Sequence, residues 1–182
     1  MRPRRSDAMG APSYPRARKR FGQHFLEHAW VNKLIAALGT APEDIFVEIG
    51  PGRGALTRAL APHVARIVAV EIDRDLAEVL PANAPAHVRV VTGDFLHVAL
   101  DELLRDEPLP LRVIGNLPYN VASPILFRLL HDAQHGRRFR DATLMLQKEV
   151  ADRIMATVGT AEYGVLALQV GLLADVERIL TL

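Results

Sequence analysis

The sequence has 182 residues, of which 49% are apolar, and 22 Lys and Arg nearly balance 21 Asp and Glu to give a formal net charge of +1. This apolar share is sufficient for a folded domain and excludes a wholly disordered chain, whereas no apolar run reaches the ~18 residues of a membrane span. The chain contains no Cys, which excludes disulfides, thiolate catalysis and Cys-ligated metal clusters, and we expect a cytoplasmic protein.

Positive charge is concentrated at the N-terminus. Residues 1–20 hold seven Arg and Lys and a single Asp, a formal charge of +6, whereas the rest of the chain carries −5. A basic arm on a mildly acidic body is typical of proteins that bind a polyanion such as nucleic acid. On charge alone, a solvated and disordered start is the more common explanation. The arm is not followed by the apolar stretch of a secretory signal.

The first half of the chain alternates between strand and helix patterns. Short apolar runs bounded by Gly, Pro or charged residues predict strands over 45–49, 67–70 and 88–91. Apolar residues spaced three and four apart predict helices over 31–38, 56–60 and 76–80.

The second half continues the alternation less regularly. Strands are predicted over 111–114 and 143–146, with a weaker helix over about 97–105 and further helices beginning at Ser123-Pro124 and near Val150. Residues 164–173 are apolar except for Gln169, so that periodicity leaves helix and strand open, and 176–182 are compatible with a strand.

This alternation predicts an α/β fold, an open sheet of parallel strands joined by helical crossovers, with helices on both faces. Sheets of this kind bind ligands beyond the C-terminal ends of their strands, where the strand order reverses. The unusual residues of this sequence follow the predicted strands at those ends.

The first unusual feature is the glycine-rich stretch from Gly50 to Gly54, where the backbone can turn sharply and approach a ligand closely. Glu71 ends the second predicted strand, where a carboxylate suits the two hydroxyls of a ribose. Asp94 ends the third, where it can accept a hydrogen bond from an adenine amino group. Together these residues predict a cofactor that contains adenosine. With Ala55 the loop also fits the dinucleotide pattern G-x-G-x-x-A, which leaves a nicotinamide cofactor open.

The second feature is Asn116-Leu117-Pro118-Tyr119, which follows the fourth predicted strand. An exocyclic adenine amine is a poor nucleophile because its lone pair is delocalised into the ring. An Asn side-chain oxygen beside a backbone carbonyl held by Pro can accept its N–H bonds and aim the lone pair at a methyl donor. A Tyr one step on can stack on a base that has left its duplex. The alternative is an ordinary turn.

Six motifs follow one another along the chain: Arg18–Leu26, Glu48–Gly52, Glu71–Asp73, Gly93-Asp94, Asn116–Asn120 and Leu146–Val150. In this order they resemble the ribosomal RNA adenine N6,N6-dimethyltransferases, over residues 16 to 182. The most similar branch is the bacterial enzyme that dimethylates two adjacent adenines near the 3′ end of small-subunit (16S) rRNA.

The resemblance implies a Rossmann-like methyltransferase sheet, S-adenosylmethionine as cofactor and small-subunit rRNA in pre-ribosomal particles as partner, with no metal and no membrane. The cofactor contacts that it implies are His24, Leu26, Gly50, Glu71, Asp94 and Asn116. The catalytic motif that it implies is Asn116, Leu117, Pro118 and Tyr119, with the Tyr stacking on the target base. The basic residues 18–20 are implied to meet RNA phosphates.

The resemblance also sets the expected domain organisation. Residues 1–20 are expected to form the basic arm and residues 21–182 the catalytic domain. Members of the family continue past the equivalent of Leu182 with an aromatic loop, a last strand and a small helical RNA-binding domain, so the sheet is expected to lack its last strand. His24 stands where the family often has Asn, and a protonated His there would repel a sulfonium.

Other functions stay open at this point. One is the related branch that dimethylates large-subunit rRNA and confers antibiotic resistance, and another is a ribosome-assembly factor that binds pre-rRNA with little catalysis. A nicotinamide oxidoreductase is the weakest, because it leaves Asn116 unexplained. The stretch His24–His28 matches the zinc-binding pattern H-x-x-E-H, but the sequence offers no suitable third ligand, and we predict no metal site.

Overall fold

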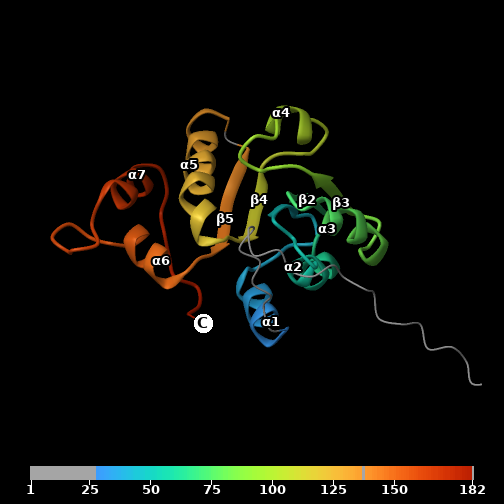
Figure 1. Cartoon of the computed structure of the whole chain (residues 1–182), viewed down its shortest axis with the longest axis horizontal. Coiled ribbons are helices and arrows are strands. Elements are labelled where there is room, and N and C mark those ends of the chain that lie inside the picture. The colour runs from blue at the N-terminus through green and yellow to red at the C-terminus, as the bar shows by residue number, and fades with distance from the viewer. Residues whose placement is uncertain (1–27, 137, 182) are drawn as a thin grey trace, which may run out of the picture.

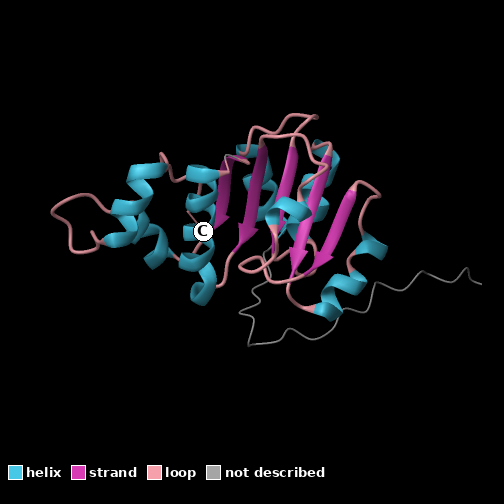
Figure 2. Ribbon diagram, turned by 90° about the horizontal axis from the view of Figure 1, so that it is seen from above, coloured by secondary structure: helices cyan, strands magenta, loops and turns pink. Residues whose placement is uncertain are grey.

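Five strands form one parallel sheet in the computed structural model, which describes residues 28–136 and 138–181 (Figure 1). The strands are β1 (Ile45–Ile49), β2 (Arg66–Glu71), β3 (Val88–Thr92), β4 (Leu111–Asn116) and β5 (Phe139–Met145). Their order in the sheet is β3-β2-β1-β4-β5, and all four pairings are parallel, as the arrows of Figure 2 show. The order reverses between β1 and β4, which is the switch point where such sheets bind ligands.

Helices precede, connect and follow the strands, as the alternating pattern predicts. They are α1 (His28–Ala37), α2 (Ala55–Leu60), α3 (Arg74–Val79), α4 (Leu100–Leu103), α5 (Tyr119–His135), α6 (Lys148–Ile154) and α7 (Val165–Leu173). Two short 3-10 helices follow α2 and α3, at Ala61–His63 and Pro81–Asn83. Within the described ranges, none of these helices is long and apolar enough to cross a membrane.

Helices cover both faces of the sheet and bury a separate apolar core on each. One core lies against α4, α5, α6 and α7, and the other against α1 and α2. Alternate residues of β1 supply both cores, with Val47 and Ile49 on the first side and Phe46 on the second. Every position of β1 is buried. Its residues are therefore apolar on both faces of the sheet instead of alternating between apolar and polar, and Glu48 is the one exception.

An ionic network holds the end of the sheet at which the strands begin. The Arg112 side chain on β4 is buried, and its guanidinium donates to Asp44 Oδ2 at 2.9 Å and to Asp141 Oδ1 on β5 at 3.0 Å. The Arg112 guanidinium also lies 4.9 Å from the ring centroid of Phe46. These contacts explain why β5 begins at Phe139, four residues before its predicted start, although its first half is polar.

The structure corrects the expected boundaries at two other places. α5 begins at Tyr119 instead of Ser123, because the Pro118 carbonyl already accepts from the N–H groups of Val121 and Ala122, and Pro124 lies inside the helix. Residues 174–181 form neither helix nor strand, so a strand over 176–182 is wrong for the residues described. A strand needs a hydrogen-bonding neighbour, and the described sheet pairs none with this segment.

Candidate functional site

The register of the sheet brings four predicted site residues into one row at the C-terminal ends of the strands. Ile49 on β1 pairs with Val70 on β2 and with Gly115 on β4, so that Gly50, Glu71 and Asn116 each follow directly. Glu71 in turn pairs with Thr92 of β3, two residues before Asp94. Neighbouring strands lie about 4.8 Å apart. The row therefore spans β3, β2, β1 and β4 across the switch point.

The glycine loop between β1 and α2 leaves its backbone open at this row. Gly50, Gly52 and Gly54 have φ angles of 66°, 58° and 75°, which other residues adopt only with strain. A Cβ atom added at Gly50 or Gly52 would meet nothing within 4 Å, whereas at Gly54 it would lie 2.5 Å from Leu80 Cδ1. The first two glycines thus provide a cradle for a ligand, and the third lets α2 and the Leu80 side chain pack closely.

Glu71 fixes the shape of this loop from β2. Its Oε2 accepts from the Gly52 N–H at 2.8 Å and its Oε1 from the Asp73 N–H at 2.9 Å. Burial raises the pKa of Glu71 above its usual range, and the two N–H bonds oppose that rise. Each carboxylate oxygen has a second lone pair, so the side chain can still accept the two hydroxyls of a ribose.

Asp94 begins a tight turn after β3. Its Oδ1 accepts from the Leu96 N–H at 2.9 Å, and its Oδ2 lies 2.9 Å from His97 Nδ1. The Asp94 carbonyl accepts from the N–H groups of His97 and Val98, both at 2.9 Å. The side chain of Asp94 is 34% exposed, so its carboxylate remains accessible at the edge of the row.

Asn116 ends β4, and the residues after it are held against the sheet. The Leu117 N–H donates to the Met145 carbonyl at 3.0 Å, and Leu117 is buried. Pro118 fixes the backbone just before α5, and Tyr119 at the first position of α5 is 57% exposed. A rigid turn therefore presents an amide, a backbone carbonyl and an exposed aromatic ring on the β4 side of the row.

Glu48 is a residue of the site that sequence reasoning did not single out. It is 1% exposed in the middle of the buried strand β1, where its Oε2 accepts from Thr57 Oγ1 at 2.7 Å. Its Oε1 is buried without a hydrogen-bond partner among the described residues. Burial raises the pKa of Glu48 to about 7, and the nearby charge of Glu71 adds to this effect, while the Thr57 bond opposes it. The sequence does carry a signal for this residue, because a carboxylate inside an otherwise apolar strand is costly to bury and therefore unusual.

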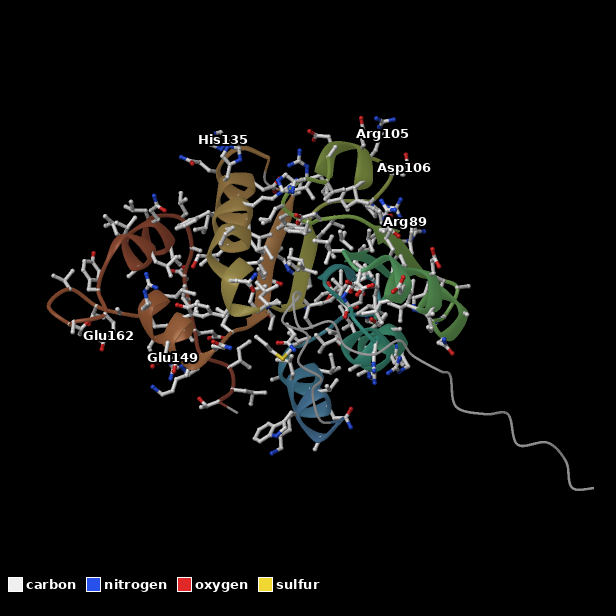
Figure 3. All side chains as sticks on the ribbon, viewed as in Figure 1. Arg89, Arg105, Asp106, His135, Glu149 and Glu162 are labelled. Carbon is white, nitrogen blue, oxygen red and sulfur yellow. The ribbon has the colours of Figure 1, made fainter. Side chains whose placement is uncertain are left out.

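Two predicted cofactor contacts, His24 and Leu26, lie outside the described residues, as does the basic arm. A cavity of about 240 Å³ lies at the C-terminal end of β5, where α1, α6 and the segment after α7 also line it. Its lining includes Met145, which pairs with Asn116, but none of the four residues of the row. Within residues 28–136 and 138–181, no three His, Asp or Glu side chains converge to hold a metal. The stacked pair His131 and His135, with ring centroids 4.3 Å apart, lies at the far end of α5 (Figure 3).

The sequence of residues 15–182 matches the family described as ribosomal RNA adenine dimethylase. The chain belongs to this family. The match covers β1 to β5 and every residue of the row. It confirms the family to which the six motifs of the sequence pointed.

Named relatives in the family come from several bacteria. A Burkholderia protein called ribosomal RNA small subunit methyltransferase A is 44% identical over 167 residues, which are 90% of this chain and 59% of the relative. A protein of the same name from Acidithiobacillus ferrooxidans is 43% identical over 169 residues, 92% of this chain and 62% of the relative. The chain thus spans about three fifths of the length of these relatives.

Solved structures of similar proteins agree with the fold. A dimethyladenosine transferase from Plasmodium falciparum superposes with a TM-score of 0.67 at 30% identity, over 79% of this chain and 50% of that one. The 23S rRNA methyltransferase ErmE superposes with a TM-score of 0.57 at 27% identity, over 78% and 50% of the two chains. The Rossmann-like methyltransferase fold expected from the resemblance is therefore confirmed.

Proposed function

We propose that the chain is the catalytic part of an S-adenosylmethionine-dependent dimethyltransferase that acts on adenine N6 atoms of small-subunit rRNA. The observation that carries this proposal is the row of Asp94, Glu71, Gly50 and Asn116 across the switch point of the sheet. The names and identities of the bacterial relatives support small-subunit rRNA as the substrate over large-subunit rRNA.

The residues of the row fit S-adenosylmethionine chemically. The open backbone at Gly50 leaves room for the methionine part, the carboxylate of Glu71 suits the ribose hydroxyls, and that of Asp94 suits the adenine amine. By the resemblance, His24 and Leu26 complete the site from the preceding segment. S-adenosylmethionine, when bound, supplies a methyl group that its sulfonium makes electrophilic. The buried Oε1 of Glu48 behind the loop, which has no partner among the described residues, also favours a ligand with positive charge.

The β4 side of the row suits the target amine. Asn116 and the backbone carbonyl of Leu117 can accept its two N–H bonds, and so orient the nitrogen lone pair toward the cofactor side of the row. Tyr119 has an exposed ring that can stack on the flipped base, a contact worth ~1–3 kcal/mol. Asn116 needs only to hold and orient the amine, because the amine loses its proton after the methyl transfer.

Calorimetry with two ligands tests the cofactor. The purified chain is expected to bind S-adenosylmethionine and to show no heat of binding with NAD, because Asn116 has no part in a hydride-transfer site. Binding of NAD alone would contradict the methyltransferase proposal. It would instead favour the interpretation of the glycine loop, with Ala55, as a dinucleotide-binding motif.

Methyl incorporation into undermethylated ribosomal subunits tests the substrate. We expect transfer to adenines of the small subunit and none to the large subunit, with small subunits that already carry the modification as the control. Labelling of the large subunit would favour the resistance-type branch. Binding to small subunits without any labelling would favour an assembly factor.

The basic arm, residues 1–20, is proposed to supply RNA affinity without choosing the sequence. Each phosphate that it neutralises should contribute about −0.7 to −0.9 to the slope of log K against log salt concentration. Removing residues 1–20 should therefore flatten that slope and leave the methylated position unchanged. A slope that does not change would identify the arm as a solvated tail.

A further inference from the structure

The two sides of the proposed site are carried by different elements, and one side chain joins them. Asn116 at the end of β4 and Tyr119 at the start of α5 lie on the target side, whereas Asp94 belongs to the turn after β3, on the cofactor side. Between β3 and β4 in the sheet lie β2 and β1, so that no sheet hydrogen bond links the two elements directly. Arg128, in the middle of α5, reaches the turn after β3.

The turn from Asp94 to Val98 is closed at both ends by hydrogen bonds. The Asp94 carbonyl accepts from the Val98 N–H, and the Asp94 carboxylate accepts from the Leu96 N–H. These bonds fix the shape of the turn, which the buried Phe95 side chain and the bond from the Gly93 N–H to the Glu71 carbonyl attach to the sheet and its core. The direction of the Asp94 carboxylate also depends on the contacts made by the far end of the turn, at Val98.

Arg128 attaches this far end of the turn to α5. Its Nη2 donates to the Val98 carbonyl, and its guanidinium carbon lies 5.4 Å from the ring centroid of Phe95, which is buried. Burial lowers the pKa of Arg128, and the negative charge of Asp94 opposes this effect, which places the two charges within electrostatic range of each other. The guanidinium therefore contacts the middle and the end of the turn that carries Asp94.

We propose that Arg128 is a positioning residue for the adenine of the cofactor, because it holds the turn of residues 94–98 against α5 so that the Asp94 carboxylate faces the adenine amine. This inference rests on the proposed function, in which Asp94 receives that amine. Arg128 itself touches neither cofactor nor substrate. Its effect should therefore be specific for ligands that carry the amine.

The chain offers a matched control in Arg89. Its Nη2 also donates to a backbone carbonyl of a neighbouring segment, that of Leu103, but at the beginning of β3 instead of its end. Figure 3 shows the Arg89 side chain near Asp106, which follows α4 in the chain. Arg89→Met removes a contact of this kind, together with an ion pair to Glu107 at 3.5 Å, without touching the turn of residues 94–98.

The test compares the affinity of each variant for S-adenosylhomocysteine and for its inosine analogue, in which an oxygen replaces the amine. Arg128→Met is expected to weaken binding of S-adenosylhomocysteine about tenfold, equal to ~1.4 kcal/mol, and to leave the inosine analogue nearly unaffected. Arg128→Lys, which keeps the charge but not the fork of donors, should show a smaller loss with the same preference. Arg89→Met should not change the ratio of the two affinities.

A double-mutant cycle asks whether Arg128 acts through Asp94. If it does, Asp94→Asn combined with Arg128→Met should bind S-adenosylhomocysteine about as weakly as Asp94→Asn alone. Equal losses for the two ligands, or additive losses in the cycle, would show a general structural role and overturn the proposal.

Amide hydrogen exchange in the ligand-free chain gives an independent measurement. The His97 and Val98 N–H groups should exchange faster in Arg128→Met than in Arg89→Met, because the turn is no longer held. Unchanged exchange there would overturn the positioning role whatever the ligand data. Failure of the unaltered chain to bind S-adenosylhomocysteine, with faster exchange in Arg128→Met, would instead count against the proposed function.

Discussion

Replacing Asn116 by Ala is expected to lower the kcat of methyl transfer about a thousandfold, while the Kd of S-adenosylmethionine changes only a few times. The reason is that Asn116 stands on the β4 side of the row, where we propose that its amide meets the target amine, whereas the residues at the ends of β1, β2 and β3 are proposed to hold most of the cofactor. Single-turnover rates on undermethylated small subunits and calorimetry with the cofactor measure the two effects separately.

Asn83→Ala is a suitable control for the loss of an Asn side chain. Asn83 lies in the 3-10 helix after α3, where its Nδ2 donates to the Val79 carbonyl at 3.0 Å, away from the row. Its removal should leave kcat unchanged. Near-normal turnover in Asn116→Ala would show that another group orients the amine, and the proposed mechanism would then be wrong.

The strands show what local pattern can and cannot predict. The boundaries of β1 match the prediction, because its apolar run is bounded by Asp44 and Gly50. The polar first half of β5 gives no such signal, since it is held by the contact between Arg112 and Asp141, which are 29 residues apart. The stretch that becomes α7 is apolar except for Gln169 and has no visible period, so that only the packing of one side against α5 and α6 identifies the helix.

The candidate site also contains residues that the local sequence predicts and one that it does not. Gly50, Glu71, Asp94 and Asn116 were predicted from residue type and from their positions after strands, and a parallel sheet brings such positions together; their roles remain predictions. Arg128 could not be found in this way, because the middle of a helix carries no signal for the loop that it will face. Its contact depends on α5 covering the face of the sheet on which Phe95 is buried.

Glu48→Gln is expected to raise the stability of the chain at alkaline pH and to leave it nearly unchanged at acidic pH. The pKa of Glu48 is raised from 4.5 to about 7 in the folded chain. Between these two values the folded chain binds a proton that the unfolded chain lacks, so this stabilising contribution is complete below pH 4.5 and is lost as the pH rises through 7. At ~1.4 kcal/mol per unit of pKa shift, the free energy of unfolding falls by roughly 3 kcal/mol between these limits.

Thermal unfolding measured from pH 5 to pH 8.5 checks the sign. The side-chain amide in Glu48→Gln cannot ionise. At the high-pH end of this range the variant should therefore have a Tm about 5–10 °C above that of the unaltered chain, whereas at the low-pH end the two Tm values should be similar. Asp44, whose pKa is also shifted, is present in both proteins and cancels in the difference, whereas the repulsion between Glu71 and Glu48 is removed in Glu48→Gln and forms part of the expected effect. Parallel Tm curves for the two proteins would show that Glu48 does not titrate in this range.

The same carboxyl group should couple cofactor binding to proton release. S-adenosylmethionine carries a sulfonium and an ammonium group, and a positive ligand near the glycine loop favours the ionised form of Glu48, whose Oε1 has no partner among the described residues. Near pH 7, where about half of the Glu48 carboxyls carry a proton, binding should therefore release up to about half a proton, which calorimetry in buffers of different ionisation enthalpy detects. S-adenosylhomocysteine, which lacks the sulfonium charge, should release less, and Glu48→Gln should release almost none. Equal proton release by Glu48→Gln and the unaltered chain would assign the proton to another group.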